Sequence, residues 1–138
     1  MSISGGCACG AVRFESVAAP IAVRVCWCRV CQYLGAGSGT VNAMFKTDGF
    51  SVQGKVASHR FVADSGNVIN REFCPACGTS LFSRAEVRPH MVGVRVGALD
   101  DPEVAPPEMT IWTSAAPSWA CFAADIPQMP RQAPPPKA

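Results

Sequence analysis

The sequence contains little charge, and the charge that it has is spread along the chain. Charged residues make up 16% of the chain, and the formal net charge is +2. No run of lysine and arginine concentrates this small excess, and basic residues do not interleave with aromatic ones. Nucleic-acid binding depends on such positive patches. We therefore expect no nucleic-acid partner.

Long apolar runs are also absent. No segment approaches the roughly 18 consecutive apolar residues that a membrane-spanning helix requires, so we expect no membrane partner. Residues 1–6 lack the basic and apolar regions of a secretory signal, and the expected compartment is the cytoplasm. Disulfides are disfavoured there. The eight cysteines of this 138-residue chain need another explanation, and metal binding is the first to consider.

The remaining composition predicts a mainly β domain. Hydrophobic residues make up 49% of the chain, which suffices for one packed core at this length. Short segments rich in β-branched and aromatic residues recur between turn-forming residues, and several alternate as half-buried strands do. Strands are expected over residues 11–15, 21–26, 40–45, 59–63, 68–73, 80–83, 91–99 and 109–113. One short helix or turn is expected over residues 29–34.

The C-terminal tail differs in composition from the rest of the chain. Five of the twelve residues 127–138 are proline, and this density of proline prevents a packed element. We expect one domain over residues 1–126, followed by a proline-rich tail that is flexible or lies extended on the surface.

Seven of the cysteines fall into three clusters. These are Cys7 and Cys9, then Cys26, Cys28 and Cys31, then Cys74 and Cys77. Thiolates one or two residues apart can converge on one metal ion, whereas a disulfide across a Cys-x-Cys loop is strained. Cys121 stands alone and is expected to be a buried apolar residue.

The first and third clusters match each other. Cys9 is followed by Gly10 and Cys77 by Gly78, and glycine permits the positive-φ turn that wraps backbone amides around thiolate sulfur. The two pairs predict one tetrahedral site, which is structural because four cysteines leave no coordination position open. Its ligands are Cys7, Cys9, Cys74 and Cys77. The alternatives are metal-free buried thiols, or a pairing of the first cluster with the second that leaves the third with only two ligands.

The second cluster differs in offering three thiolates, from Cys26, Cys28 and Cys31. Three protein ligands with one vacant position are typical of a catalytic zinc. The alternative is a second structural site. Its fourth ligand would then come from Cys121, His59 or His90.

The motifs together resemble those of one known family. They are Gly5-Gly6-Cys7-Ala8-Cys9-Gly10, Cys26-x-Cys28-x-x-Cys31, Cys74-Pro75-Ala76-Cys77-Gly78-Thr79 and a closing Ala115-Ala116-Pro117-Ser118-Trp119 segment. Their order resembles the glutathione-dependent formaldehyde-activating enzyme family, which includes the centromere protein V domain. Many members have His where this chain has Trp27, and a basic residue where it has Gln32, but the cysteines are unchanged.

The resemblance implies a fold and a chemistry. The fold is a small zinc-stapled domain of several coiled antiparallel sheets, similar to the Mss4-like or β-tent class. In the family the first and third clusters hold a structural zinc, and the middle cluster holds the zinc assigned to catalysis. The implied reaction is the addition of glutathione to formaldehyde, which is a carbon–sulfur lyase reaction in reverse. A non-catalytic zinc-binding interaction module is the alternative function.

Glutathione carries two carboxylates, so its cleft is expected to contain cationic groups. Arg24, Arg29 and Arg71 lie close in the sequence to cysteine clusters and are candidates. Trp27, between two of the cysteines, is a candidate for shielding the metal from water. Solvated arginines and ordinary aromatic packing are the alternatives at these positions.

Overall fold

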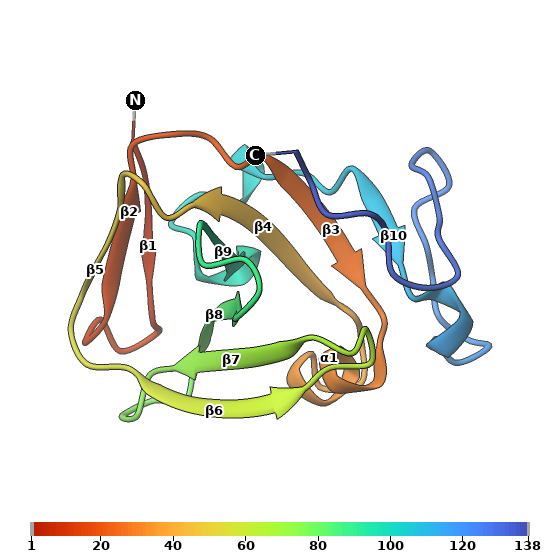
Figure 1. Cartoon of the computed structure of the whole chain (residues 1–138), viewed down its shortest axis with the longest axis horizontal. Coiled ribbons are helices and arrows are strands. Elements are labelled where there is room, and N and C mark those ends of the chain that lie inside the picture. Colours follow the sequence, from red (N-terminus) through yellow and green to blue (C-terminus); the bar gives the residue numbers. More distant parts are fainter. Residues whose placement is uncertain (1, 138) are drawn as a thin grey trace.

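The structure is a computed structural model that describes residues 2–137 and consists mainly of β-strands (Figure 1). The strands are β1 (Ile3–Gly6), β2 (Arg13–Ser16), β3 (Ala22–Cys26), β4 (Thr40–Lys46), β5 (Phe50–Gln53), β6 (Ala57–Val62), β7 (Val68–Phe73), β8 (Ser80–Ala85), β9 (Met91–Arg95) and β10 (Met109–Ile111). The helices are α1 (Arg29–Leu34) and the 3-10 helices η1 (Val96–Ala98), η2 (Pro102–Val104) and η3 (Thr113–Ala115). Within residues 2–137, no helix is long and apolar enough to cross a membrane.

The strands form two sheets. A three-stranded sheet has the order β1-β2-β5, and a seven-stranded sheet has the order β10-β3-β4-β9-β8-β7-β6. The paired strands are antiparallel except for β10 and β3, which run parallel. The prediction of a mainly β domain is confirmed, and this one parallel pair departs from the expected antiparallel arrangement.

The hydrophobic core contains side chains from both sheets. Phe14 of the small sheet packs edge-to-face against Phe82 of the large sheet, with ring centroids 5.3 Å apart. Phe14 also stacks on Phe50 at a centroid distance of 5.7 Å. Val92 and Val94 of β9 are completely buried in the same core. Aromatic contacts therefore hold one sheet against the other.

The opposite face of the large sheet carries a different set of side chains. Because side chains alternate between the two faces of a strand, the neighbours of the buried valines point away from the core. On β9 these are Met91 and Arg95. Arg95 lies directly opposite Asn42 of β4, and Gly93, which has no side chain, lies opposite Met44. This second face lines the pocket described below.

Most predicted elements are present, with some changes at their ends. The helix has the predicted bounds, and the Cys28 sulfur caps it by accepting a hydrogen bond from the Cys31 backbone N–H. The strand predicted over residues 91–99 is too long. It ends at Arg95 because the chain turns through η1 and brings Leu99 against Gly5 of the small sheet. The strand predicted over residues 109–113 ends at Ile111 because Trp112 has a left-handed φ of 60°.

Two strands, β1 and β5, were not predicted. The β1 segment contains two glycines among four residues and therefore has low intrinsic strand propensity. Tertiary packing requires glycine there, since a Cβ at Gly5 would lie 2.2 Å from the Ala98 carbonyl oxygen. The close approach of the Ala98 backbone to β1 thus explains the glycine at position 5, which local strand propensity disfavours.

The described part of the proline-rich tail lies extended along β10 (Figure 1). Thr110 N–H donates to the Pro127 carbonyl at 2.9 Å, and Met129 N–H donates back to the Thr110 carbonyl at 2.8 Å. Farther along, the Arg24 guanidinium of β3 donates to the Pro134 carbonyl at 2.8 Å. Ala133, between these contacts, is buried. The tail therefore has hydrogen-bond partners on two neighbouring strands.

Removal of residues 127–138 is expected to lower the free energy of unfolding by about 2 kcal/mol or more. The reason is that several intramolecular hydrogen bonds, each contributing about 1 kcal/mol, are lost together. Urea denaturation followed by tryptophan fluorescence measures the difference. Removal of residues 137–138 alone is the control and should change stability by less than about 0.5 kcal/mol. A fully truncated chain as stable as the parent would show that the tail does not hold to β10.

Candidate metal centres

The first cysteine pair lies in the turn between β1 and β2. Cys7 N–H donates to the Val12 carbonyl at 3.0 Å, and Gly10 N–H donates to the Cys7 carbonyl at 3.1 Å. Gly10 has a φ of 81°, which glycine adopts without steric strain. The same turn directs the Val12 N–H to the Cys7 sulfur at 3.2 Å. The turn thus places a backbone donor on a sulfur, as its glycine predicted.

The third pair lies in the turn between β7 and β8 and repeats this geometry. Cys74 N–H donates to the Thr79 carbonyl at 3.0 Å, and Gly78 N–H donates to the Cys74 carbonyl at 2.9 Å. Gly78 has a φ of 78°. The two cysteine pairs therefore lie in closely similar turns, one in each sheet.

Tertiary packing brings the two turns together. Ala8 N–H of the first turn donates to the Thr79 hydroxyl of the second at 3.1 Å. Neighbouring sulfurs are 3.5 and 3.8 Å apart, and a tetrahedral site with metal–sulfur bonds of about 2.3 Å requires separations of about 3.8 Å. The donor set therefore fits a thiolate-binding ion such as zinc. Four sulfurs lie within 4.8 Å of one another, those of Cys7, Cys9, Cys74 and Cys77.

Hydrogen bonds favour the thiolate form of one member of this cluster, Cys77. The Cys77 sulfur lies 3.1 Å from the Thr79 hydroxyl. This hydroxyl and the Thr79 backbone N–H lower the pKa of Cys77 to about 5. Thiolate is the form of cysteine that binds metals. Cys7 and Cys74 are buried while Cys9 and Cys77 are exposed, so the cluster lies at the edge of the core.

The second cysteine cluster lies where β3 leads into α1. Cys26 ends β3, Cys28 caps α1, and Cys31 lies within the helix. All three are buried, and their sulfurs lie within 4.8 Å of one another. The Cys31 N–H donates to the Cys28 sulfur at 3.4 Å. A strand end and a helix start thus fix three sulfurs around one point.

The proximity of these three thiols changes their acidity. The pKa of Cys31 is lowered to about 3, because the Cys26 and Cys28 thiols donate hydrogen bonds to its sulfur. The pKa of Cys26 is raised, chiefly by its hydrogen bonds with Cys28 and Cys31 and also by burial. Soft sulfur donors held this close together suit zinc or iron.

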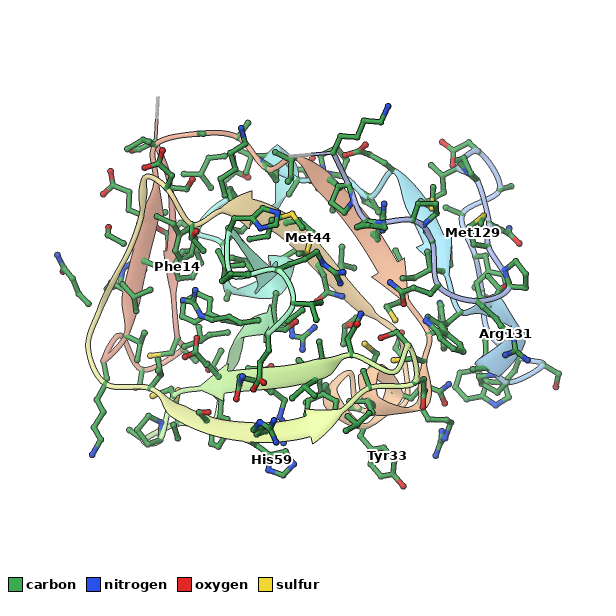
Figure 2. The ribbon with its side chains drawn as sticks, in the orientation of Figure 1. Phe14, Tyr33, Met44, His59, Met129 and Arg131 are labelled. Atoms are coloured by element: carbon green, nitrogen blue, oxygen red, sulfur yellow. The ribbon has the colours of Figure 1, made fainter. Side chains whose placement is uncertain are left out.

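Within residues 2–137, no fourth His, Cys, Asp or Glu completes the second cluster. Cys121 is exposed, so the expectation of a buried residue is wrong, and its sulfur lies 4.0 Å from the Trp119 carbonyl. His59 projects outward from β6, with its ring stacked on Phe61 (Figure 2). His90 is exposed in the turn before β9. None of the side chains considered as a fourth ligand joins this cluster.

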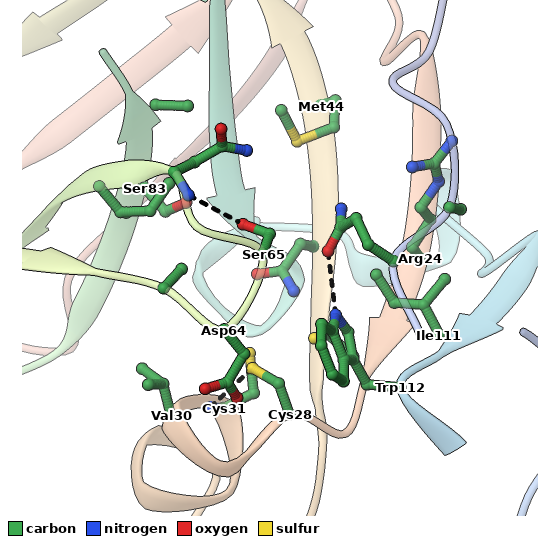
Figure 3. A pocket seen from close by; sticks show the side chains of 18 of the residues that line it. Arg24, Cys28, Val30, Cys31, Met44, Asp64, Ser65, Ser83, Ile111 and Trp112 are labelled. Atoms are coloured by element: carbon green, nitrogen blue, oxygen red, sulfur yellow. Dashed lines mark hydrogen bonds between the residues drawn. The ribbon is translucent and has the colours of Figure 1, made fainter. Parts of the chain in front are cut away.

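The three-cysteine cluster lines a pocket of about 300 Å³. Figure 3 shows Cys28 and Cys31 at one end of this pocket, with Met44, Ile111 and Trp112 along its walls. All seven strands of the large sheet contribute to the lining, β10 through Ile111. The tail contributes as well, through residues between 132 and 136.

One of the three arginines considered from the sequence lines this pocket, namely Arg24. Arg29 instead donates to the Gln32 side chain at 2.5 Å and lies over the Tyr33 ring. Arg71 does not contribute to the lining. The sequence did not lead us to Arg95, which lines the pocket. The available signal was a charged residue within the otherwise apolar Val92-Gly93-Val94-Arg95-Val96 segment.

Two residues at which the chain departs from the family motif support the cysteine loop. Trp27 is buried, and its ring packs edge-to-face against Phe122 at a centroid distance of 5.8 Å. The buried Gln32 side chain donates to the Trp27 carbonyl at 2.7 Å and to the Ala115 carbonyl at 3.0 Å. These contacts fix the loop against the C-terminal part of the chain.

Comparisons with known proteins identify relatives of this chain. The sequence model of the glutathione-dependent formaldehyde-activating enzyme family matches residues 2–115. A Halomonas elongata protein, provisionally named as a glutathione-dependent formaldehyde-activating enzyme, is 29% identical over 113 residues, which cover 78% of this chain and 72% of that protein. A crystal structure of a Rhodobacter sphaeroides protein shares the fold, with a TM-score of 0.58 at 20% identity over 91% of this chain and 98% of that one. Because the family match extends over most of the sequence, this protein belongs to the glutathione-dependent formaldehyde-activating enzyme family.

Proposed function

We propose that this protein is a zinc-dependent enzyme of the carbon–sulfur lyase type that adds a thiol, such as glutathione, to formaldehyde or a related small electrophile. Family membership supports a role with glutathione and formaldehyde. The observation that carries the proposal is a three-cysteine cluster that lines a pocket and has no fourth protein ligand within residues 2–137. The proposed compartment is the cytoplasm, where reducing conditions keep cysteines available for metal.

Two zinc ions have different tasks in this proposal. The four-cysteine cluster would hold a structural ion, because four thiolates leave no coordination position for a substrate. The cluster of Cys26, Cys28 and Cys31 would hold the ion that serves the reaction, because three ligands leave one position open. The two tasks thus follow from the number of cysteines in each cluster.

In the proposed reaction, a thiol adds across the carbonyl group of the electrophile. A carbon–sulfur bond and an oxygen–hydrogen bond form, while the sulfur–hydrogen bond of the thiol and the π bond of the carbonyl break, so that the thiol proton ends on oxygen. When bound, zinc supplies deprotonation of the thiol, whose ordinary pKa of about 8.5 leaves little thiolate at neutral pH.

The chain's own residues prepare the place for this addition. The apolar walls formed by Met44, Ile111 and Trp112 limit the water around the reacting sulfur. Electrostatic interactions are stronger in such surroundings than in bulk water. Arg95 is partly buried, and its charge interacts with the sulfurs of Cys31 and Cys26. It therefore places positive charge close to the position that a negative sulfur must occupy.

Cys31→Ser is expected to reduce the zinc content from about two ions per chain to about one, since only the three-cysteine site loses a ligand. Metal analysis after dialysis measures the content, and circular dichroism is expected to show an unchanged fold. Cys121→Ser is the matched control, because Cys121 is exposed and lies outside both clusters. Loss of both ions, or of neither, in Cys31→Ser would contradict the assignment of two independent sites.

Cys74→Ser is expected to unfold or aggregate the protein. Binding of a structural zinc contributes ~10–16 kcal/mol in small zinc domains, and Cys74 is completely buried. Thermal denaturation measures the loss of stability, again with Cys121→Ser for comparison. A Cys74→Ser protein that melts at the parent's temperature would rule out the four-cysteine pairing.

Exchange NMR on mixtures of glutathione and formaldehyde tests the reaction itself. The zinc-loaded parent is expected to form S-(hydroxymethyl)glutathione faster than the spontaneous reaction does. Cys31→Ser is expected to return the rate to the spontaneous value. A parent that gives no acceleration at high protein concentration would remove the enzyme proposal and leave a non-catalytic zinc-binding module.

A further inference from the structure

Two arginines and an asparagine form a row across three neighbouring strands. Arg24 of β3 lies directly opposite Asn42 of β4, and Asn42 lies directly opposite Arg95 of β9. Residues opposite each other in an antiparallel ladder project from the same face of the sheet, and all three line the pocket. Cys26, two residues after Arg24, lines it as well. The row therefore adjoins the three-cysteine cluster.

Arg95 has only neutral hydrogen-bond partners although it is partly buried. Its guanidinium donates to the Asn42 side-chain oxygen and, at 3.4 Å, to the Ser80 hydroxyl. None of the ion pairs found within residues 2–137 includes Arg95. The opposite charge near Arg95 is that of the cysteine sulfurs, and a partly buried charge that lacks a direct ion-pair partner is costly. The position of Arg95 therefore favours a negative group that enters the pocket.

Arg24 is held in the pocket wall without an ion pair of its own. Its guanidinium donates to the Pro134 carbonyl of the tail at 2.8 Å. Glu108 attracts it from outside the lining, and no ion pair joins the two in the described part of the chain. Figure 3 shows Arg24 on the same side of the pocket as Trp112. A guanidinium has five N–H donors, so most of those on Arg24 remain for a ligand.

The cysteine sulfurs do not balance the positive charge of this pocket. Three thiolates around a divalent ion retain one negative charge between them. The arginines in the lining are Arg24, Arg88 and Arg95, whereas its one carboxylate among the described residues is Asp64. Positive charge is therefore in excess in the lining, and this excess favours an anionic ligand.

Much of the remaining lining is apolar, and it includes Met44, Phe61, Ile69, Ile111 and Trp112. Apolar walls bind the carbon skeleton of a ligand, while a few polar groups fix its orientation. The planar guanidinium matches a carboxylate in particular, because two parallel N–H groups can donate to its two oxygens. The pocket thus suits an organic molecule with a carboxylate at one end.

We propose that Arg24 and Arg95 bind a carboxylate of the substrate, so that the pocket selects carboxylate-bearing thiols. This inference rests on the proposed function, since the molecule bound in this way is the thiol substrate. Its sulfur would lie at the site formed by Cys26, Cys28 and Cys31. Asn42 is a positioning residue in this arrangement, because its side-chain oxygen accepts from the Arg95 guanidinium.

Isothermal titration calorimetry of the zinc-loaded, full-length protein with S-methylglutathione tests the proposal. This probe keeps both carboxylates of glutathione but has no thiol, so its binding does not depend on the reaction. Its dimethyl ester lacks both negative charges and is the comparison ligand. The parent is expected to bind the acid about tenfold or more tightly than the ester, because charge-assisted hydrogen bonds are the strong ones.

Arg95→Met and Arg24→Met are each expected to weaken binding of the acid by about tenfold and to leave binding of the ester unchanged. Arg60→Met is the matched control, because Arg60 is exposed, pairs with Glu86 at 2.8 Å and does not line the pocket. Zinc content and circular dichroism check that each variant folds. If Arg95→Met does not fold, Arg24→Met and Arg95→Lys test the proposal instead. Arg95→Lys should then bind the acid more tightly than Arg24→Met does.

Three results would overturn the proposal: equal affinity of the parent for acid and ester, no binding of the acid at millimolar concentration, or arginine variants that bind the acid as Arg60→Met does. The outcome of the NMR measurement of glutathione addition to formaldehyde is independent of these binding results. Charge-dependent binding without acceleration would overturn the proposed reaction alone. Acceleration without charge-dependent binding would overturn only the carboxylate site.

Discussion

The convergence of four sulfurs from two turns is the constraint on which the rest of the structure depends. One turn joins β1 to β2 in the small sheet, and the other joins β7 to β8 in the large sheet. The sulfurs of Cys7 and Cys77 lie close together, and a metal ion bound between them would close a loop of more than half the domain and fix how the sheets approach each other. Phe14, after the first turn, then meets Phe82, after the second. The approach of the two turns thus brings four cysteines together and also determines how the core packs.

The two faces of the large sheet have different roles, since one packs in the core and the other lines the pocket. On β9, Val92 and Val94 are buried in the core, while Arg95 points to the pocket. Because alternation fixes both faces at once, a shift of this strand by one residue would move the valines into the pocket and the arginine into the core. The core packing that stabilises the sheet therefore also holds the pocket residues in register, next to the three-cysteine cluster.

Local features of the structure could be predicted from the sequence. The spacing of the cysteines, and the glycines that follow Cys9 and Cys77, indicate the two turns because only a few neighbouring residues determine a turn. The period-two pattern located most strands of the large sheet, since the pattern records which side chains face the core. The helix over residues 29–34 had the correct bounds. Each of these features depends on residues that are close together in the chain.

The sequence by itself determined which residues can bind metal and which segments form the strands of the large sheet, since both depend on short-range spacing. Only the tertiary structure decided which distant segments meet. Arg95 lies in the same pocket as Cys26 because β9 pairs with β4 and β4 pairs with β3. The strand β1 forms where Ala98 approaches Gly5 too closely for any Cβ. The tail lies along β10 because the backbone of Thr110 offers it a donor and an acceptor. These contacts join residues far apart in the chain, and no local pattern encodes their register.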